Sequence, residues 1–360
     1  MSDNDSREGM AMTPMSETAA SEATTRGTAT AGDPVGPPHV NPAHVNPAQV
    51  GFAHVSVMAE EVTAVLSVVP DGWVIDATLG GGGHAQALLN TNPGISILGL
   101  DQDQSALDAA GQRLASAGTR VQLCHTRFDQ LGETVNRLNT RPVTGALFDL
   151  GVSSPQLDRG DRGFSFRHDG PLDMRMDQTS STTAADLVNT LDERALSSLL
   201  TRHADERHAR RIARAIVAAR PISTTGQLAE IVRDAVPAAA RRSGGHPARK
   251  TFQALRIEVN EELVILADAL RLALDLLEPG GRCAVLSYHS GEDRIVKQVF
   301  RDASGDAPRP RADLPPPPGS EATVKLLWRG AVRPSEDEIA KNPRAEAARF
   351  RAVEKLQGAA

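Results

Sequence analysis

Between residues 73 and 150 the sequence alternates between short apolar runs and stretches whose apolar residues recur at helical spacing. The apolar runs cover residues 73–76, 95–101, 121–125 and 145–150, and helices are expected at 85–89 and 105–117. Repeated strand–helix–strand units form a parallel sheet that is covered by helices on both faces. The sequence therefore predicts an α/β fold built on a Rossmann-like sheet.

The alternation stops after Leu150 and resumes only near residue 252. The interval has helical patterns at 187–200, 207–217 and 227–236 but no strong strand signal. A long helical pattern over 252–277, a strand at 283–288, a helix from 293 and a last strand near 323–327 follow. We therefore expect an inserted all-helical domain, residues 158–247, within a discontinuous sheet domain made of residues 51–157 and 248–333.

The two ends of the chain have a different composition. Residues 1–50 are rich in Ser, Thr, Ala, Gly and Pro, which predicts a disordered tail. Its tandem repeat contains His39 and His44, for which a solvated repeat is favoured over weak metal binding, so no metal site is predicted. Residues 334–360 are polar and are expected to form a partly helical tail.

Charge and cysteine content limit the class of protein. The net charge of −6 excludes a polycation, and the two cysteines, Cys124 and Cys283, lie in expected strands and form no disulfide framework. No run of 18 apolar residues occurs, so no membrane contact and a cytoplasmic location are expected. Whether the chain is a monomer or a homodimer stays open.

A glycine-rich loop, Asp76 to His84, follows the first expected strand directly and precedes a helix. Glycines let the backbone approach a ligand, and the helix start offers free N–H donors. Asp101 ends the next strand, where a carboxylate can accept both ribose hydroxyls of a nucleoside. The glycine spacing differs from that of dinucleotide enzymes, which argues against NAD and favours another nucleoside cofactor.

A polar loop, Asp149 to Asp158, follows the fourth expected strand. Ligands of open parallel sheets bind at the carboxyl ends of the strands. Asp149, Ser154 and Gln156, with the rigid Pro155, suit a planar polar substrate. A plain Asx or Ser-Pro turn is the alternative.

Basic residues are concentrated in the helical interval. Residues 202–256 hold twelve Lys and Arg against four Asp and Glu, in a chain that is acidic overall. Phosphate binding is favoured over a merely solvated basic face. Four arginines recur at i, i+3, i+4 and i+7, which predicts one helical face, and two further cations extend the patch: Arg207, Arg210, Arg211, Arg214, Arg249 and Lys250.

Seven stretches together resemble the RsmH (MraW) family, the bacterial methyltransferases H of small-subunit ribosomal RNA. They are residues 76–84, 149–156, 162–166, 170–177, 206–217, 246–260 and 287–297, and the resemblance runs from about His54 to Lys355. It implies a Rossmann-like S-adenosylmethionine methyltransferase with an inserted helical domain. It also implies N4-methylation of a cytosine in the decoding (P-site) region of 16S ribosomal RNA within the small subunit.

The resemblance also implies roles for individual residues. The cofactor S-adenosylmethionine would be bound by a set spread over the sheet: Gly82, Gly83, His84, Asp101, Phe128, Asp149 and Gln156. Phe128, which would lie beside the adenine, looks like a core residue from the sequence alone. Tyr288 stands where the family often has Phe.

The catalytic group stays open at this level. Ser154 and Pro155 resemble half of the loop that amino-group methyltransferases present to their substrate, and His289 is the other candidate, with a structural role equally open. Two other classes remain as rivals: a non-catalytic RNA-binding assembly factor that keeps the fold, and a nucleotide-dependent dehydrogenase.

Overall fold

The computed structural model describes residues 56–241, 245–306 and 321–358. The described residues belong to one compact unit, so the boundaries between a sheet domain and an inserted domain stay a prediction. The tail predicted for residues 1–50, with the repeat that contains His39 and His44, lies outside the described residues. None of the helices in these ranges is long and apolar enough to cross a membrane.

A seven-stranded sheet with the order β3-β2-β1-β4-β5-β7-β6 forms the centre of the molecule. Neighbouring strands from β3 to β5 are parallel, and β7 is antiparallel to both of its neighbours. The strands are β1 Gly72–Asp76, β2 Ile95–Asp101, β3 Val121–His125, β4 Val143–Asp149, β5 Leu277–Ser287, β6 Val324–Leu326 and β7 Arg349–Lys355. The predicted Rossmann-like α/β fold is confirmed.

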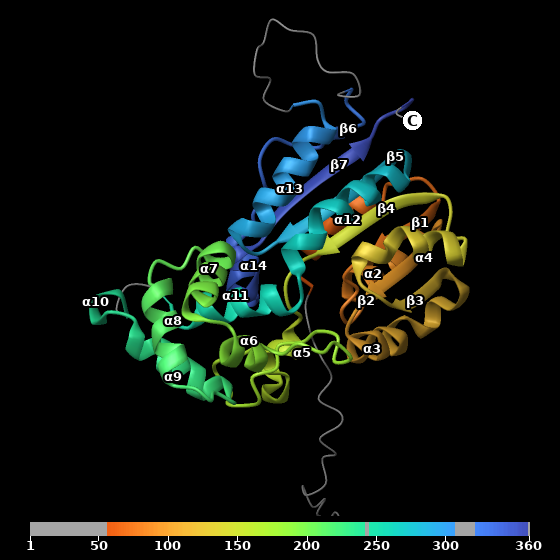
Figure 1. Ribbon diagram of the computed structural model, residues 1–360. Helices are drawn as coiled ribbons and strands as arrows, with labels where there is room; N and C mark the ends of the chain where they lie inside the picture. Colours follow the sequence, from red (N-terminus) through yellow and green to blue (C-terminus); the bar gives the residue numbers. More distant parts are fainter. Residues whose placement is uncertain (1–55, 242–244, 307–320, 359–360) are drawn as a thin grey trace, which may run out of the picture. The chain divides into compact units, whose positions relative to one another are not determined.

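Helices cover both faces of this sheet (Figure 1). One face packs on α1 Ala59–Leu66, α2 Gly83–Thr91 and α3 Gln104–Leu114. The other packs on α4 Leu131–Leu138, α12 Glu262–Leu276 and α13 Ser290–Ala303. The central strands β1, β2 and β4 are mainly apolar because both of their faces are covered by these helices.

The C-terminal segment differs from the polar tail that the sequence predicts. It contains a short helix, α14 Glu336–Lys341, and then β7, which lies between β5 and β6. Phe350, Ala352 and Val353 of β7 are buried in the core, and Lys355 donates a hydrogen bond to the Leu274 carbonyl at 3.0 Å. The prediction of a tail is therefore wrong for residues 349–355.

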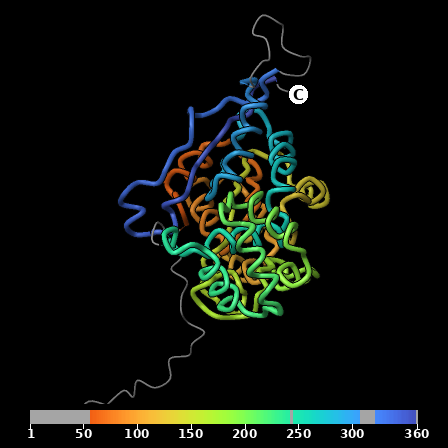
Figure 2. The backbone as a smooth tube through the Cα atoms, turned by 60° about the vertical axis from the view of Figure 1, so that its left-hand side comes forward, coloured from red at the N-terminus to blue at the C-terminus, as the bar shows by residue number. Residues whose placement is uncertain are grey.

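The helical interval contains seven helices within the described residues, and they are grouped beyond the carboxyl ends of β4 and β5 (Figures 1 and 2). They are α5 Ser154–Asp158, α6 Ala184–Thr190, α7 Glu193–Ala204, α8 Ala209–Ala218, α9 Thr225–Ala235, α10 Ala238–Arg241 and α11 Arg249–Val259. Their buried residues, together with Phe164, Leu172, Met174 and Met176 from the preceding loop, form a hydrophobic cluster separate from those on the two faces of the sheet.

Two predicted helices are each divided in the structure. The helix predicted at 187–200 is interrupted before α7, where the Asp192 side chain accepts a hydrogen bond from the Ala195 N–H and so begins a new helix. The helix predicted at 252–277 is interrupted between α11 and α12, where Glu261 adopts φ 53°. No Gly or Pro marks this second break, so the apolar pattern alone does not reveal it.

The crossover in the strand order sets the place of a ligand site. From β1 the chain builds β2 and β3 on one side and then returns to place β4 on the other side of β1. In open α/β sheets the crevice at this switch point, outside the carboxyl ends of the strands, binds the ligand. Asp76, Asp101 and Asp149 end β1, β2 and β4 and therefore lie around this crevice.

Candidate active site

The glycine loop between β1 and α2 has the backbone geometry that its sequence predicts. Gly80 and Gly82 adopt φ 52° and 74°, in the left-handed region that side chains avoid. At Gly83 a Cβ atom would lie only 2.1 Å from the Ser56 hydroxyl oxygen. Because Gly82 precedes the first turn of α2, the N–H groups of the helix start face the end of the sheet.

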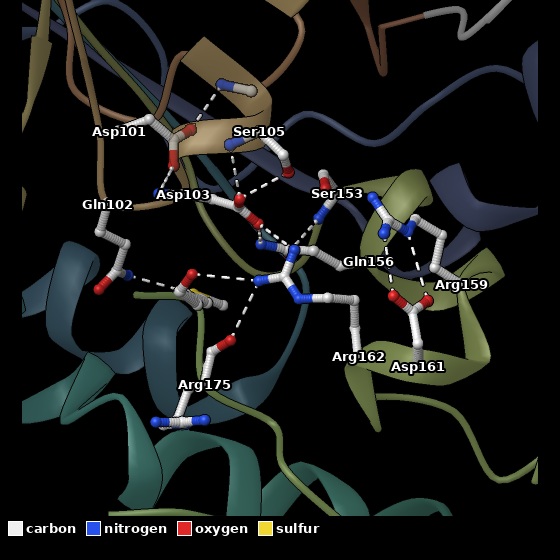
Figure 3. Close-up of polar contacts among 12 residues, drawn as sticks. Asp101, Gln102, Asp103, Ser105, Ser153, Gln156, Arg159, Asp161, Arg162 and Arg175 are labelled. Atoms are coloured by element: carbon white, nitrogen blue, oxygen red, sulfur yellow. Dashed lines mark hydrogen bonds and ion pairs between the residues drawn. The ribbon is translucent and has the colours of Figure 1, made fainter. Parts of the chain in front are cut away.

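Asp101 at the end of β2 is held by two backbone donors. The Asp103 N–H donates to its Oδ1 at 2.8 Å, and the Gly80 N–H donates to its Oδ2 at 2.8 Å (Figure 3). Burial raises the pKa of Asp101 to about 6, although these hydrogen bonds act in the opposite direction. Each carboxylate oxygen keeps a lone pair, so both can accept the paired hydroxyls of a ribose.

Asp149 at the end of β4 is the centre of a second group of titratable side chains. The Tyr288 hydroxyl donates to Asp149 Oδ1 at 2.7 Å, and His84 Nε2 lies 3.4 Å from Asp149 Oδ2. The Asp149 N–H donates to the Thr78 hydroxyl oxygen at 2.6 Å. The carboxylate is 24% exposed, so it is fixed by these contacts while one side stays open to a ligand.

Burial is the largest influence on the pKa values of the titratable side chains around Asp149. It raises the pKa of Asp76 to about 7, against the opposing effect of His84. Burial alone would lower the pKa of His84, but Asp149 and Asp76 raise it above its usual value. Burial, with Asp149 adding to it, also raises the pKa of Tyr288. Neither ring nitrogen of His84 has a hydrogen bond within the described residues, which suits a side chain that meets a bound ligand.

The loop after β4 forms the first turn of α5. The Ser153 N–H donates to Gln156 Oε1 at 3.0 Å, and Gln156 Nε2 donates to Asp103 Oδ2 at 3.0 Å. Gln156 therefore connects the ends of β2 and β4. The Ser154 hydroxyl has no hydrogen bond to any described residue, and Pro155 occupies the first turn of the helix. The sequence left a plain Asx or Ser-Pro turn as the alternative for this loop. A turn is present, and the Ser154 Oγ atom can still form a hydrogen bond with a ligand.

His289 has a structural role at the start of α13. Its Nδ1 accepts hydrogen bonds from the N–H groups of Gly291 and Glu292, and its Nε2 lies 3.0 Å from Glu292 Oε1. These contacts are sufficient to account for a histidine at this position without a role in catalysis. The catalytic role stays a prediction that the geometry does not favour.

Phe128 lies directly after β3, near the end of β2 that carries Asp101. Its ring packs edge-on against Phe148, with the ring centroids 5.9 Å apart, and is 8% exposed. The core appearance of Phe128 is thus correct, and its contact with an adenine stays a prediction.

The predicted basic residues lie on the surface of α8, in the turn before it and at the start of α11. Arg210, Arg211 and Arg214 are exposed on α8, whereas Arg207 lies in the turn before the helix, so the prediction that all four share one helical face is wrong for Arg207. Apart from Arg214, which lies 3.4 Å from Glu193, these arginines form no ion pair within the described residues. A pocket of about 470 Å³ is lined by Ser197, Thr201, Glu206, Arg207, His208, Ala209, Arg210 and Arg211.

The two other predicted cations lie at the start of α11. Arg249 and Lys250 are both exposed, and Lys250 Nζ donates to the Asp205 carbonyl at 2.9 Å. Because Asp205 directly precedes the turn that begins α8, this hydrogen bond joins the two parts of the basic surface.

Sequence reasoning missed three residues at the ends of the strands. Tyr288 contacts Asp149, the buried Arg162 contacts Asp103, and Glu338 of α14 accepts a hydrogen bond from the Met58 N–H at 2.5 Å. These contacts join residues that are far apart in the sequence. The signals in the sequence are the positions of Arg162 and Tyr288 within two of the stretches that resemble the family.

The fold and the site define a Rossmann-like methyltransferase that uses S-adenosylmethionine. The sequence model of the MraW methylase family matches residues 51–356, and the chain belongs to this family. The chain is 51% identical over 311 residues to "Ribosomal RNA small subunit methyltransferase H" of Thermobifida fusca, an alignment that covers 85% of this chain and 94% of the relative. The protein of the same name from Symbiobacterium thermophilum is 49% identical over 311 residues, with 85% and 98% covered.

Structural similarity adds nothing to this assignment. An rRNA methylase from Streptococcus thermophilus aligns over 83% of this chain and 94% of its own, at 15% identity and a TM-score of 0.36. Membership of the MraW family confirms the resemblance seen in the sequence and the predicted cofactor, S-adenosylmethionine. It also excludes the dehydrogenase alternative. The roles of the individual site residues, the cytoplasmic location and a homodimer stay predictions.

Proposed function

We propose that this protein transfers a methyl group from S-adenosylmethionine to the exocyclic N4 of a cytosine in the decoding (P-site) region of 16S ribosomal RNA. The names of its relatives support a small-subunit RNA substrate. The structural observation that carries the proposal lies at the end of β4. There the Asp149 carboxylate is partly exposed, and the Ser154 hydroxyl at the start of α5 has no hydrogen bond to a described residue. Asp149 and Ser154 both lie at the switch point of the strand order, beside the glycine loop between β1 and α2.

The cofactor residues can be given roles by their chemistry. The bound cofactor supplies a methyl group that is activated on a sulfonium. Gly82 and Gly83 bring the backbone close to it, Asp101 accepts hydrogen bonds from its ribose, and the Phe128 ring packs beside its adenine. The buried side chains of His84 and Gln156, with Asp149, complete the binding surface.

The amine of cytosine is a poor nucleophile because its lone pair is delocalised into the ring. Hydrogen-bond acceptors can draw the amine out of the ring plane and hold it in line with the methyl group. The Ser154 hydroxyl is a fitting acceptor since it has no other partner among the described residues, and Pro155 makes its backbone rigid. The proton leaves readily once the nitrogen is cationic, so no strong base is needed.

The basic surface would bind the RNA backbone. Exposed guanidinium groups contact phosphates without reading the sequence, and they position the strand so that an unstacked base can reach the catalytic crevice. The pocket formed by Arg207, Arg210 and Arg211 is open enough to receive a phosphate. Their lack of carboxylate partners leaves these arginines available for an anion.

The direct test is methylation of isolated small subunits. Purified protein is incubated with labelled S-adenosylmethionine and small subunits from cells that lack the gene, and the RNA is digested to nucleosides for mass spectrometry. We expect the label in N4-methylcytidine, and less label with an Asp101→Ala variant when S-adenosylmethionine is limiting. Label in protein or in free cytidine would contradict the proposal. Tight RNA binding without methyl transfer would favour the assembly-factor alternative.

A further inference from the structure

A buried arginine joins the cofactor end of the sheet to the loop that begins the insert. Arg162 is 4% exposed, and its Nη1 donates to Asp103 Oδ2 at 2.7 Å (Figure 3). Its Nη2 donates to the carbonyls of Arg175 and Met176, both at 3.1 Å. Both Nη atoms are thus paired, whereas the buried Nε has no hydrogen-bond partner within the described residues. Removing the carboxylate partner of such a buried charge is strongly destabilising.

On the cofactor side, Asp103 receives hydrogen bonds from several directions. Its Oδ1 accepts from the Ser105 N–H and hydroxyl at 3.0 and 2.6 Å, and its Oδ2 accepts from both Arg162 and Gln156. Burial alone would raise the pKa of Asp103, but these hydrogen bonds hold it below its usual value. The Asp103 N–H in turn orients Asp101. Asp101 and Gln156, the two expected cofactor residues, are thus both attached to the carboxylate that Arg162 fixes.

On the insert side, the carbonyls that Arg162 holds belong to a segment anchored by Asn260. The Met176 N–H donates to Asn260 Oδ1 at 2.8 Å, and Asn260 Nδ2 donates to the Met174 carbonyl at 2.9 Å. Asn260 directly follows α11, the helix whose first turn carries Arg249 and Lys250. A continuous chain of hydrogen bonds and one helix therefore connects the ribose-binding carboxylate to the basic surface.

We propose that Arg162 is a positioning residue that couples cofactor binding to RNA binding. A cofactor that occupies Asp101 and Gln156 fixes Asp103, Arg162 and the 174–176 segment, so the insert is already ordered when RNA arrives. Coupling between two sites is reciprocal, so RNA tightens cofactor binding by the same factor. This inference rests on the proposed RNA substrate and adds that the two ligands bind cooperatively.

The test compares Arg162→Gln and Arg162→Lys with the control Arg159→Gln. Arg159 lies three residues earlier, is 52% exposed, and forms an ion pair with the exposed Asp161 at 2.9 Å (Figure 3). Affinity for S-adenosylhomocysteine is measured with and without small-subunit RNA, and affinity for RNA with and without S-adenosylhomocysteine. Melting temperatures identify any variant that does not fold.

We expect the wild type and Arg159→Gln to bind each ligand about tenfold more tightly in the presence of the other, within the usual range for coupled sites. Arg162→Gln should lose this coupling and bind the cofactor about tenfold more weakly, since a charge-assisted hydrogen bond is lost. Arg162→Lys keeps the charge beside Asp103 but lacks the planar fork that reaches two carbonyls, so it should bind the cofactor nearly normally and still lose the coupling.

Full coupling in both folded Arg162 variants would overturn the proposal, and so would a wild type that binds RNA equally well with and without S-adenosylhomocysteine. A wild type that binds no RNA would instead refute the proposed function itself. The two failures are therefore distinguishable.

Discussion

Arg162 and the arginines around α8 carry the same side chain in opposite environments. Arg162 is 4% exposed and its guanidinium donates to one carboxylate and two carbonyls, whereas the side chain of Arg214 is 75% exposed and has a single contact at 3.4 Å. Arg210 and Arg211 are exposed and form no ion pair within the described residues. The buried Arg162 forms its contacts within the protein, whereas the exposed arginines can bind an anionic ligand.

The same contrast separates the two candidate ligand surfaces. At the carboxyl end of the sheet, Asp76, Asp101 and Asp149 are oriented by hydrogen bonds. Such a surface suits a compact cofactor whose atoms must be fixed precisely enough for in-line transfer. The exposed arginines of α8 are charged but are not held in one orientation by carboxylate partners. Such side chains can follow the phosphates along a flexible RNA strand. If this comparison holds, mutations in the two regions should affect different ligands.

The largest effect is expected from removing charges of the basic surface. Replacing Arg207, Arg210 and Arg214 together with Gln should weaken RNA binding by about 100-fold at low salt and reduce the slope of log affinity against log salt by about 2 to 3, because fewer counterions are released. Cofactor affinity should not change. Binding is measured by fluorescence anisotropy over a series of salt concentrations.

A matched control removes three exposed cations from the helices that cover the sheet. Arg137, Arg271 and Lys297 lie on α4, α12 and α13, and their replacement by Gln changes the net charge equally. This control should bind RNA almost as the wild type does. Parallel salt plots of equal affinity for all three proteins would mean that the α8 surface is merely solvated.

Asp101→Ala should have the opposite pattern. Loss of the hydrogen bonds to the ribose should weaken S-adenosylmethionine binding by about 30-fold, or about 2 kcal/mol, while RNA binding in the absence of cofactor is unchanged. Calorimetry measures the first quantity, with Asp108→Ala, an exposed carboxylate on α3, as the control. Unchanged cofactor affinity in a folded Asp101→Ala protein would remove this residue from the site.

The burial of Asp76 predicts a pH-dependent cost to stability. Its pKa is raised from 3.8 to about 7 on folding, so its contribution to stability is present below pH 3.8 and is lost as the pH rises through 7. Asp76→Asn imitates the protonated form and should raise the free energy of unfolding by about 1–3 kcal/mol at pH 8, with little change at pH 3.5. Urea unfolding at both values checks this, and an equal change at both would contradict it.

The smallest effect is expected for Tyr288→Phe. The ring stays half-buried and only the hydrogen bond to Asp149 is lost, so cofactor affinity should fall by about threefold while methyl transfer continues. Calorimetry and methyl transfer to small subunits measure the two quantities. A loss of all activity would mean that the Tyr288 hydroxyl takes part in the reaction rather than orienting Asp149.

Sequence patterns predict the regions where local and tertiary structure agree. The strands β1, β2 and β4 are mainly apolar because both of their faces are covered, whereas the edge strand β3 is only partly buried. β2 and β3 begin and end at the predicted residues. β7 was missed because its outward-facing residues Arg349, Arg351 and Glu354 make it look polar. In the structure these charges pair with Asp293 and Arg282.

The candidate site was predictable to a similar extent. Glycines and acids at strand ends have local signatures, so the loop before α2, Asp101 and Asp149 could be found from the sequence. The link from Asp103 to Arg162 spans 59 residues, and the link from Asp149 to Tyr288 spans 139. Such contacts depend on the tertiary fold, and no local pattern indicates them.

The most direct test of the central claim is nucleoside mass spectrometry of small-subunit RNA from cells with and without this gene. We expect one N4-methylated cytosine in the decoding region of RNA from wild-type cells and its absence from the deletion. It should return fully with the intact gene and to a lower level with the Asp101→Ala form. An unchanged set of methylated cytosines after deletion would contradict the account.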